Sequence, residues 1–217
     1  MTRRNGLIPA LLAAAVIAAP PVLSAGKPTG PRATVTVDDA KPDYAPIVER
    51  KLDFYSFTYE TVEGRPFDLR DYAQGKSVVF VEYLAGWCPS SNRNGHIVER
   101  LWTKYRERGL GVVGVAEYSD AAELRIHIGR IGIDYPLVVE TRKRDQRKAS
   151  SHYKYRRAVG DNRKWGTPFY VIIDARDIES AAHNGPFTRR VYTISGEMVE
   201  AEVDQFIQER AADTRRR

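Results

Sequence analysis

Residues 77–91 constrain the fold more than any other stretch of the chain. Residues 77–84 are almost entirely apolar, β-branched or aromatic, as in a buried strand, and residues 85–86 offer a small hinge. Trp87, Cys88 and Pro89 follow, and apolar residues at helical spacing come after them. The positive end of a helix dipole favours a thiolate over a thiol. The stretch therefore predicts a strand, a tight turn and a helix, with Cys88 at the start of the helix.

Strand-like and helix-like segments alternate through the rest of the chain. Further strands are predicted at residues 54–59, 112–116, 135–139, 168–173 and 191–194, and further helices at residues 119–131 and 197–211. The order β-α-β-α-β, then β-β-α, predicts an α/β fold with a mixed central sheet and helices on both faces.

The N-terminal segment has the marks of a secretory signal peptide. Arg3 and Arg4 precede an apolar run at residues 7–19, and small residues follow at 24–26. We predict cleavage near Ala25, with an uncleaved N-terminal anchor as the alternative. A membrane-spanning helix needs about 20 apolar residues, so no stable span is expected after cleavage. The predicted location is periplasmic or extracellular.

Four segments are predicted along the chain. Residues 1–25 are the signal peptide, and residues 26–47, rich in Pro, Gly, Asp and Thr, are a flexible linker. Residues 48–211 form the folded domain, and residues 212–217 are a basic tail. The formal net charge of the whole chain is +6, so the mature protein is expected to be mildly basic.

Cys88 is the only cysteine in the chain. Exported proteins normally pair their cysteines in disulfides, and a lone cysteine is either a small buried hydrophobe or a free reactive thiol. Its place between a strand and a helix favours the reactive, partly exposed thiol.

No metal or cofactor is predicted. The four histidines, at positions 96, 127, 152 and 183, show no ligand-like spacing with Cys88 or with one another. No glycine-rich loop precedes a helix in a phosphate-binding pattern, so no nucleotide is expected either.

The predicted order is a strand, Trp87-Cys88-Pro89, a helix, a strand, a helix and then Thr167-Pro168 before a hairpin. Over residues 52–210 this order resembles a thioredoxin fold. The chain is most similar to the exported redoxin branch, the periplasmic thiol–disulfide reductases related to the alkyl hydroperoxide reductase/thiol-specific antioxidant group. The resemblance implies that Cys88 is the attacking cysteine and that Glu82 is a buried acid behind it. It also implies a cis bond before Pro168. An extended substrate would bind near Thr167 and Trp87, and Pro89 and Ser91 would also contribute to the substrate-binding edge. The alternative for Glu82 is a carboxylate at a strand edge, facing solvent or an ion-pair partner.

Ser91 departs from the pattern of the family, which has a second cysteine at this position. A dithiol reductase needs that second thiol to displace its product, and a serine hydroxyl is too weak an acid to replace it. The chain can therefore attack a disulfide, form a mixed disulfide that an external thiol resolves, or be oxidised to a sulfenic acid. In the family the acid at the position of Glu82 chiefly deprotonates the resolving thiol, which this chain lacks.

Residues 141–164 carry ten Lys or Arg against two Asp, interleaved with His152, Tyr153 and Tyr155, and Trp165 follows. The resemblance places this stretch beside the cysteine, where it predicts an acidic protein partner or an anionic surface. The alternative is a solvated helix over residues 144–159 with a charged outer face. Nucleic acid fits badly with export and is not expected.

Three functions follow, in order of preference. The first is a thiol–disulfide oxidoreductase that works through Cys88 alone, with protein thiols and disulfides as partners. The second is a non-catalytic binding or chaperone-like module with the same fold. The third is a one-cysteine peroxidase, which the sequence disfavours because peroxidases of this fold have Thr three residues before the cysteine and this chain has Ala85.

Overall fold

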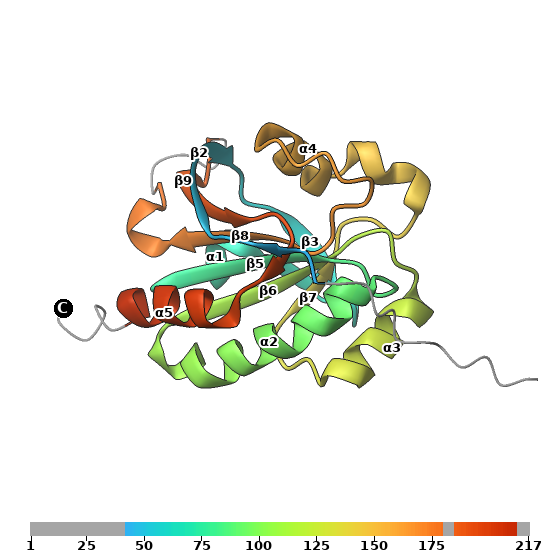
Figure 1. Cartoon of the computed structure of the whole chain (residues 1–217), viewed down its shortest axis with the longest axis horizontal. Coiled ribbons are helices and arrows are strands. Elements are labelled where there is room, and N and C mark those ends of the chain that lie inside the picture. The colour runs from blue at the N-terminus through green and yellow to red at the C-terminus, as the bar shows by residue number, and fades with distance from the viewer. Residues whose placement is uncertain (1–41, 180–184, 212–217) are drawn as a thin grey trace, which may run out of the picture. The chain divides into compact units, whose positions relative to one another are not determined.

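A computed structural model describes residues 42–179 and 185–211, and its centre is an eight-stranded mixed sheet in the order β2-β9-β8-β5-β6-β7-β3-β4 (Figure 1). The strands are β2 (Val48–Phe54), β3 (Thr58–Thr61), β4 (Pro66–Asp68), β5 (Val78–Leu84), β6 (Leu110–Ala116), β7 (Leu137–Val139), β8 (Phe169–Asp174) and β9 (Thr188–Ile194). Strands β5, β6 and β7 are parallel, whereas the other neighbours pair antiparallel. A separate parallel pair joins β1 (Tyr44–Ala45) to β10 (Glu197–Met198).

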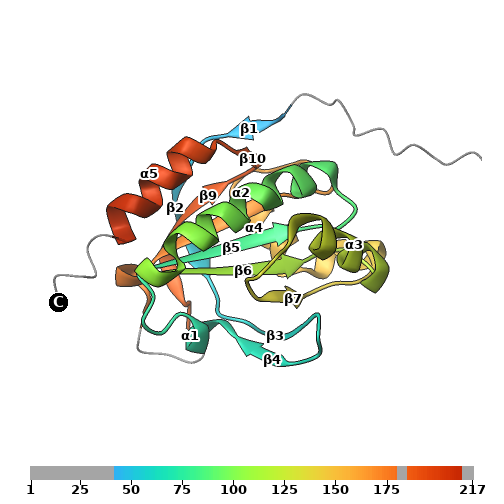
Figure 2. The same cartoon turned by 90° about the horizontal axis from the view of Figure 1, so that it is seen from below.

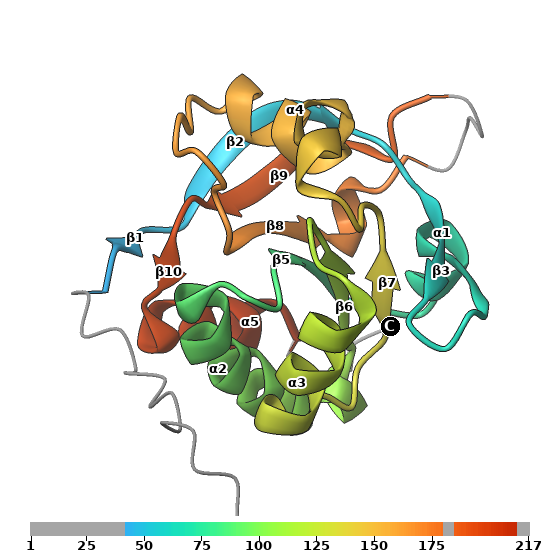
Figure 3. The ribbon, with the colours of Figure 1, turned by 90° about the vertical axis from the view of Figure 1, so that its right-hand side faces the viewer.

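Helices cover both faces of the sheet, as the sequence predicted. They are α1 (Leu69–Tyr72), α2 (Pro89–Tyr105), α3 (Ala121–Ile131), α4 (Ser151–Ala158) and α5 (Glu200–Ala211). Figures 1 and 2 show α2, α3 and α5 on one side of the sheet, and Figure 3 shows α4 on the other. The predicted α/β fold with a mixed central sheet is confirmed.

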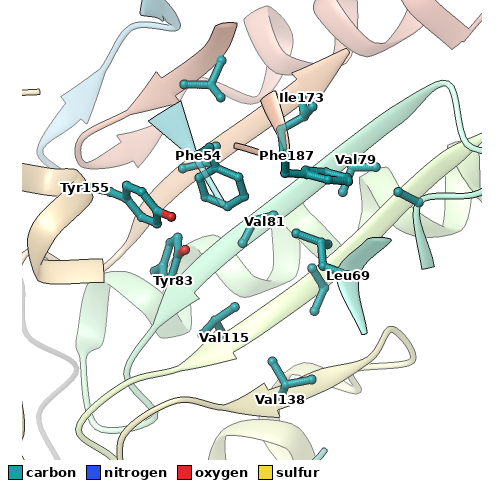
Figure 4. Packing of buried hydrophobic residues seen from close by; sticks show 14 of the residues in the cluster. Phe54, Leu69, Val79, Val81, Tyr83, Val115, Val138, Tyr155, Ile173 and Phe187 are labelled. Atoms are coloured by element: carbon teal, nitrogen blue, oxygen red, sulfur yellow. The ribbon is translucent and has the colours of Figure 1, made fainter. Parts of the chain in front are cut away.

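Strand β5 is buried on both faces, which explains its continuous apolar run. Val79, Val81 and Tyr83 point into the cluster that includes Phe54 and Tyr155 (Figure 4). The alternate residues Val78 and Phe80 pack in the opposite cluster, under α2 and α5. Because side chains alternate along a strand, Glu82 lies on the same face as Phe80.

Local signals fix the ends of the helices beside this strand. Pro89 is the first residue of α2, where a missing N–H costs nothing. Helix α3 starts with a capping box, in which Asp120 and Glu123 each accept a backbone N–H of the other residue. Gly132 ends α3 in the left-handed conformation that glycine adopts easily.

Some predicted elements differ from the structure. Residues 54–59 are not one strand, because β2 ends at Phe54 and β3 begins at Thr58. The last helix begins at Glu200 and not at residue 197, because residues 197–198 pair with β1. That pair also puts β1 inside the segment predicted to be a linker.

The alternative of one helix over residues 144–159 also differs from the structure. The structure has a 3-10 turn at Arg144–Ala149 followed by α4, with Ser150 between them. The Ser150 hydroxyl accepts the backbone N–H of Tyr153 at 3.1 Å and so caps a new helix.

The predicted signal peptide and basic tail lie outside the described residues, as do most of the linker and His183. Among the helices of the described ranges, none is long and apolar enough to cross a bilayer.

Gly86 brings the turn after β5 close to the first turn of α3. A Cβ at this position would lie 2.8 Å from the Glu123 carbonyl oxygen and 3.2 Å from the Leu124 nitrogen. Since both atoms belong to the backbone, Gly86→Ala is expected to lower the free energy of unfolding by about 1–3 kcal/mol. Urea unfolding measures the change.

Gly129→Ala is the matched control, because Gly129 lies exposed in α3 with open space around its Cα. It is expected to raise stability by up to about 1 kcal/mol, the difference in helix propensity. A Gly86→Ala protein as stable as the unmodified one would contradict the close approach.

Candidate active site

Cys88 is the N-cap residue of α2, directly after the turn that leaves β5. Its backbone N–H donates to Ala85 O at 2.9 Å, and its carbonyl accepts the N–H of Asn92 at 3.0 Å. Its thiol donates to the Thr167 carbonyl, with Sγ and O 3.4 Å apart. Cys88 is 8 % exposed, so the expected partial exposure is wrong in degree: the thiol contacts the Thr167 carbonyl instead of solvent.

The sheet brings Thr167 to the cysteine. Strands β5 and β8 are antiparallel neighbours with Tyr83 opposite Phe169, so the residues before β8 lie beside the residues after β5. The bond between Thr167 and Pro168 is cis, as predicted. The Thr167 side chain is 6 % exposed, and its backbone faces the thiol.

His152 and Arg163 hold the loop that ends in Thr167. The Gly166 carbonyl accepts from His152 Nε2 and from Arg163 Nη2, each at 3.2 Å, and Arg163 also donates to Pro168 O at 3.2 Å. Since His152 Nε2 faces a carbonyl, we assign the proton to this nitrogen, and Nδ1 accepts from the Tyr118 hydroxyl at 2.9 Å. Burial lowers the pKa of His152 well below its ordinary value, so the ring is neutral.

Arg156 lies completely buried beneath the same loop. It forms an ion pair with Asp161 at 3.4 Å and donates to Arg163 O at 3.1 Å. Any Cβ at Gly166 would collide with its guanidinium. The basic segment is therefore not simply a solvated helix, because one side of it supports the Thr167 loop.

Ser91 and Asn92 hold the cysteine turn from the other side. Ser91 is fully buried, and its hydroxyl accepts the N–H of Ala85 at 3.3 Å. The Asn92 amide donates to Gly86 O at 3.2 Å and to Cys88 O at 3.0 Å. Its own carbonyl accepts from His127 Nδ1 at 2.9 Å. Burial lowers the pKa of His127 to about 4, so this histidine is also neutral.

Glu82 is a buried acid, and the alternative at a solvent-facing edge is wrong. It is fully buried on β5 and accepts a hydrogen bond from the Tyr135 hydroxyl at 2.9 Å. Its second oxygen has no partner in the described part of the chain. Burial raises the pKa of Glu82 to about 7, although the bond from Tyr135 lowers it in part.

Trp87 and Pro89 border the thiol on its outer side. Trp87 is half-buried, and its Nε1 donates to Tyr118 O at 3.0 Å. Its ring packs edge-on against Trp165, with centroids 5.4 Å apart. Pro89 is exposed at the first turn of α2.

The structure thus brings together Cys88, Trp87, Thr167 and Pro168, with Glu82 on the strand that leads to them. Three site residues were missed: Asn92, His127 and His152. The contacts of His127 with Asn92 and of His152 with Tyr118 join residues more than 30 positions apart. The other contact of His152, with Gly166, spans 14 positions and depends on the Thr167 loop. Within residues 42–179 and 185–211, no group of three or more His, Cys, Asp or Glu side chains lies close enough to hold a metal ion.

The raised pKa of Glu82 makes stability depend on pH. The folded protein retains the proton between pH 4.5, the ordinary pKa, and about 7. The free energy of unfolding therefore falls as pH rises through this window, by roughly 3 kcal/mol in total. Glu82→Gln removes this loss, so its stability relative to the unmodified protein is expected to grow between about pH 5 and about pH 8.

Urea unfolding at both pH values measures the difference. Glu60→Gln, at an exposed position of β3, is the control and is expected to show no such trend. An equal pH dependence for Glu82→Gln and the unmodified protein would show that Glu82 titrates normally.

Solved structures of thiol:disulfide interchange proteins share the fold. One, a thioredoxin family protein from Chlorobium tepidum, is 24% identical with a TM-score of 0.51, covering 80% of this chain and 99% of its own. Another, from Bacteroides sp., is 12% identical with a TM-score of 0.52, covering 75% and 90%. At these identities the likeness shows the fold alone.

Sequence comparison gives relatives and a family. Thiol-disulfide oxidoreductase ResA of Halalkalibacterium halodurans is 27% identical over 85 residues, which are 39% of this chain and 47% of the relative. ResA of Bacillus thuringiensis is 24% identical over 86 residues, 39% and 48% of the two chains. The chain thus matches about half the length of these relatives. The sequence model of the Redoxin family matches residues 38–197, and the chain therefore belongs to the Redoxin family.

Proposed function

We propose that the protein is an exported thiol–disulfide oxidoreductase that works through Cys88 alone, with an external thiol to complete the cycle. The observation that carries the proposal is the contact between Cys88 Sγ, at the start of α2, and the Thr167 carbonyl next to the cis bond. Membership of the Redoxin family and the likeness to proteins named thiol-disulfide oxidoreductase ResA support it.

The reaction begins when the Cys88 thiolate attacks one sulfur of a substrate disulfide. A bond forms between Cys88 and that sulfur, the substrate S–S bond breaks, and the other sulfur leaves as a thiolate that takes up a proton. A second, external thiol then attacks the mixed disulfide. It leaves with the substrate as a new disulfide, and Cys88 returns to the reduced state.

The Thr167 backbone receives the substrate in this scheme. In the free protein its carbonyl accepts the Cys88 S–H at 3.4 Å. An extended substrate segment that pairs there by β-type hydrogen bonds displaces this contact and brings its own sulfur to Cys88. His152 and Arg163 both donate hydrogen bonds to the Gly166 carbonyl, and these bonds hold the neighbouring Thr167 carbonyl in place.

Ser91 keeps the geometry of the turn without its redox chemistry. Its hydroxyl binds the Ala85 N–H inside the protein, and it offers no sulfur to displace the substrate. Glu82, with its pKa raised to about 7, is half protonated near neutral pH. We assign it the role of a proton store on the strand behind the cysteine.

Export follows from the predicted signal peptide at residues 1–25. It places the protein in the periplasm or outside the cell, where substrate disulfides persist. Mass spectrometry of the secreted protein tests it, with a mature N-terminus near Gly26 as the expected result.

The burial of Cys88 favours one other function, a binding module that holds extended chains without redox chemistry. Cys88 is 8 % exposed and its thiol is already hydrogen-bonded, so it is less accessible than the partly exposed thiol expected of an attacking cysteine. The two functions separate on Cys88→Ser, which abolishes partner capture by an oxidoreductase and leaves capture by a binding module unchanged.

Titration with the disulfide 5,5′-dithiobis(2-nitrobenzoate) tests the proposal. The native protein is expected to release one equivalent of thionitrobenzoate and to retain the other as an adduct, because Cys88 is its single thiol. Ser91→Cys is expected to release two equivalents and retain none, because the second thiol displaces the adduct. Absorbance gives the release and intact mass gives the adduct.

Ser90→Cys is the matched control, since it adds a thiol one residue away on the same turn. The Ser90→Cys protein is expected to retain thionitrobenzoate adducts, whereas the Ser91→Cys protein forms an internal disulfide. If the native protein releases thionitrobenzoate only after unfolding, Cys88 is inert and the binding module is the better account.

A further inference from the structure

We propose that the surface beside Cys88 selects substrate segments that carry carboxylates next to their reactive cysteine. This inference rests on the proposed function and names its substrate class. The surface consists of two tryptophans and the cations above them, and we call it the basic indole rim: Trp87, Arg144, Arg147, Lys164 and Trp165.

The two indoles of the rim flank the reactive contact. Trp87 directly precedes Cys88, and Trp165 lies two residues before Thr167. The rings meet edge-on at 5.4 Å and are both half-buried. A chain that pairs with the Thr167 backbone therefore passes over or beside them.

Three cations lie against these rings. The guanidinium of Arg144 is 5.0 Å from the ring centre of Trp87, and that of Arg147 is 5.4 Å from the ring centre of Trp165. The ammonium of Lys164 is 5.5 Å from the ring centre of Trp165. Cation–π attraction holds positive charge at such positions. The Arg147 side chain also donates to the Lys164 carbonyl, which fixes it further.

Few carboxylates neutralise the rim. Arg144 forms an ion pair with Glu123 at 2.6 Å, but neither Arg147 nor Lys164 contacts a carboxylate in the part of the chain that the structure describes. One of the two aspartates of residues 141–164, Asp161, is buried between Arg156 and Arg163. The exposed side of the segment therefore keeps an excess of positive charge.

The segment that carries the rim cations is also anchored on its inner side. The same segment sends His152 and Arg156 inward, under the loop of Thr167. Because the cations are positioned before the substrate arrives, they lose little freedom on binding it. Carboxylates beside the substrate cysteine match this arrangement, since arginine and carboxylate pair by charge-assisted hydrogen bonds.

Peptides with a single cysteine, activated as mixed disulfides with thionitrobenzoate, test the inference. Their cysteine is flanked by Glu, Gln or Lys, and attack of Cys88 on the peptide sulfur expels coloured thionitrobenzoate. At low salt the Glu peptide is expected to react about tenfold faster than the Lys peptide, and high salt is expected to reduce this ratio.

Lys164→Glu is the diagnostic variant, because Lys164 is an exposed member of the rim. It is expected to lower the ratio of Glu to Lys rates by about threefold or more. Arg108→Glu is the matched control with the same change of charge. Arg108 also lies over an aromatic ring, Tyr105, but it belongs to the 3-10 turn Arg106–Arg108 beyond the far end of α2, a helix about 25 Å long whose N-cap is Cys88.

The outcomes separate the two proposals. If the Gln peptide fails to react at all, the proposed function is wrong. If it reacts while the Glu and Lys peptides react equally fast, the inference is overturned and the proposed function stands. An equal effect of Lys164→Glu and Arg108→Glu also overturns it, because overall charge would then explain the preference. Circular dichroism confirms that both variants are folded.

Discussion

The contact between the Cys88 thiol and the Thr167 carbonyl exists because β5 and β8 are antiparallel neighbours at the centre of the sheet. The end of one strand and the start of the other must then lie at the same edge. A strand that leads directly into α2 sets the cysteine at the helix N-terminus. The rest of the site depends on this arrangement, since each further contact either holds the cysteine turn or holds the Thr167 loop.

Two neutral histidines contribute to both sides of this support. His127 binds Asn92, which in turn binds the carbonyls of the cysteine turn, and His152 binds Gly166 in the facing loop. Burial lowers the pKa of both rings, so neither gains charge near neutral pH. Glu82 differs, since burial brings its pKa to about 7. The two histidines therefore keep the same charge in the pH range where the acid behind the site titrates.

The sequence was informative wherever a local pattern or a family resemblance determined the structure. The apolar run of β5, Pro89 at the start of α2 and the cis bond before Pro168 are examples. The sequence did not predict the structure where contacts between residues far apart in the chain determine it. Nothing local distinguishes His152 or Arg156 from other members of a basic segment, and only the fold shows that they are buried. Glu82 needed both sources, because its burial depends on β5 lying at the centre of the sheet with both faces covered.

The structure retains the turn, loop and acid around the first cysteine and has Ser91 where a second sulfur would act. The central claim is that Cys88 captures a sulfur and does not release it alone. Intact mass measured over time, after reaction with a peptide disulfide and removal of the excess reagent, tests this directly. We predict that the Cys88 adduct persists until an external thiol is added and then disappears. An adduct that decays at the same rate without added thiol, or one that never forms, would contradict the account.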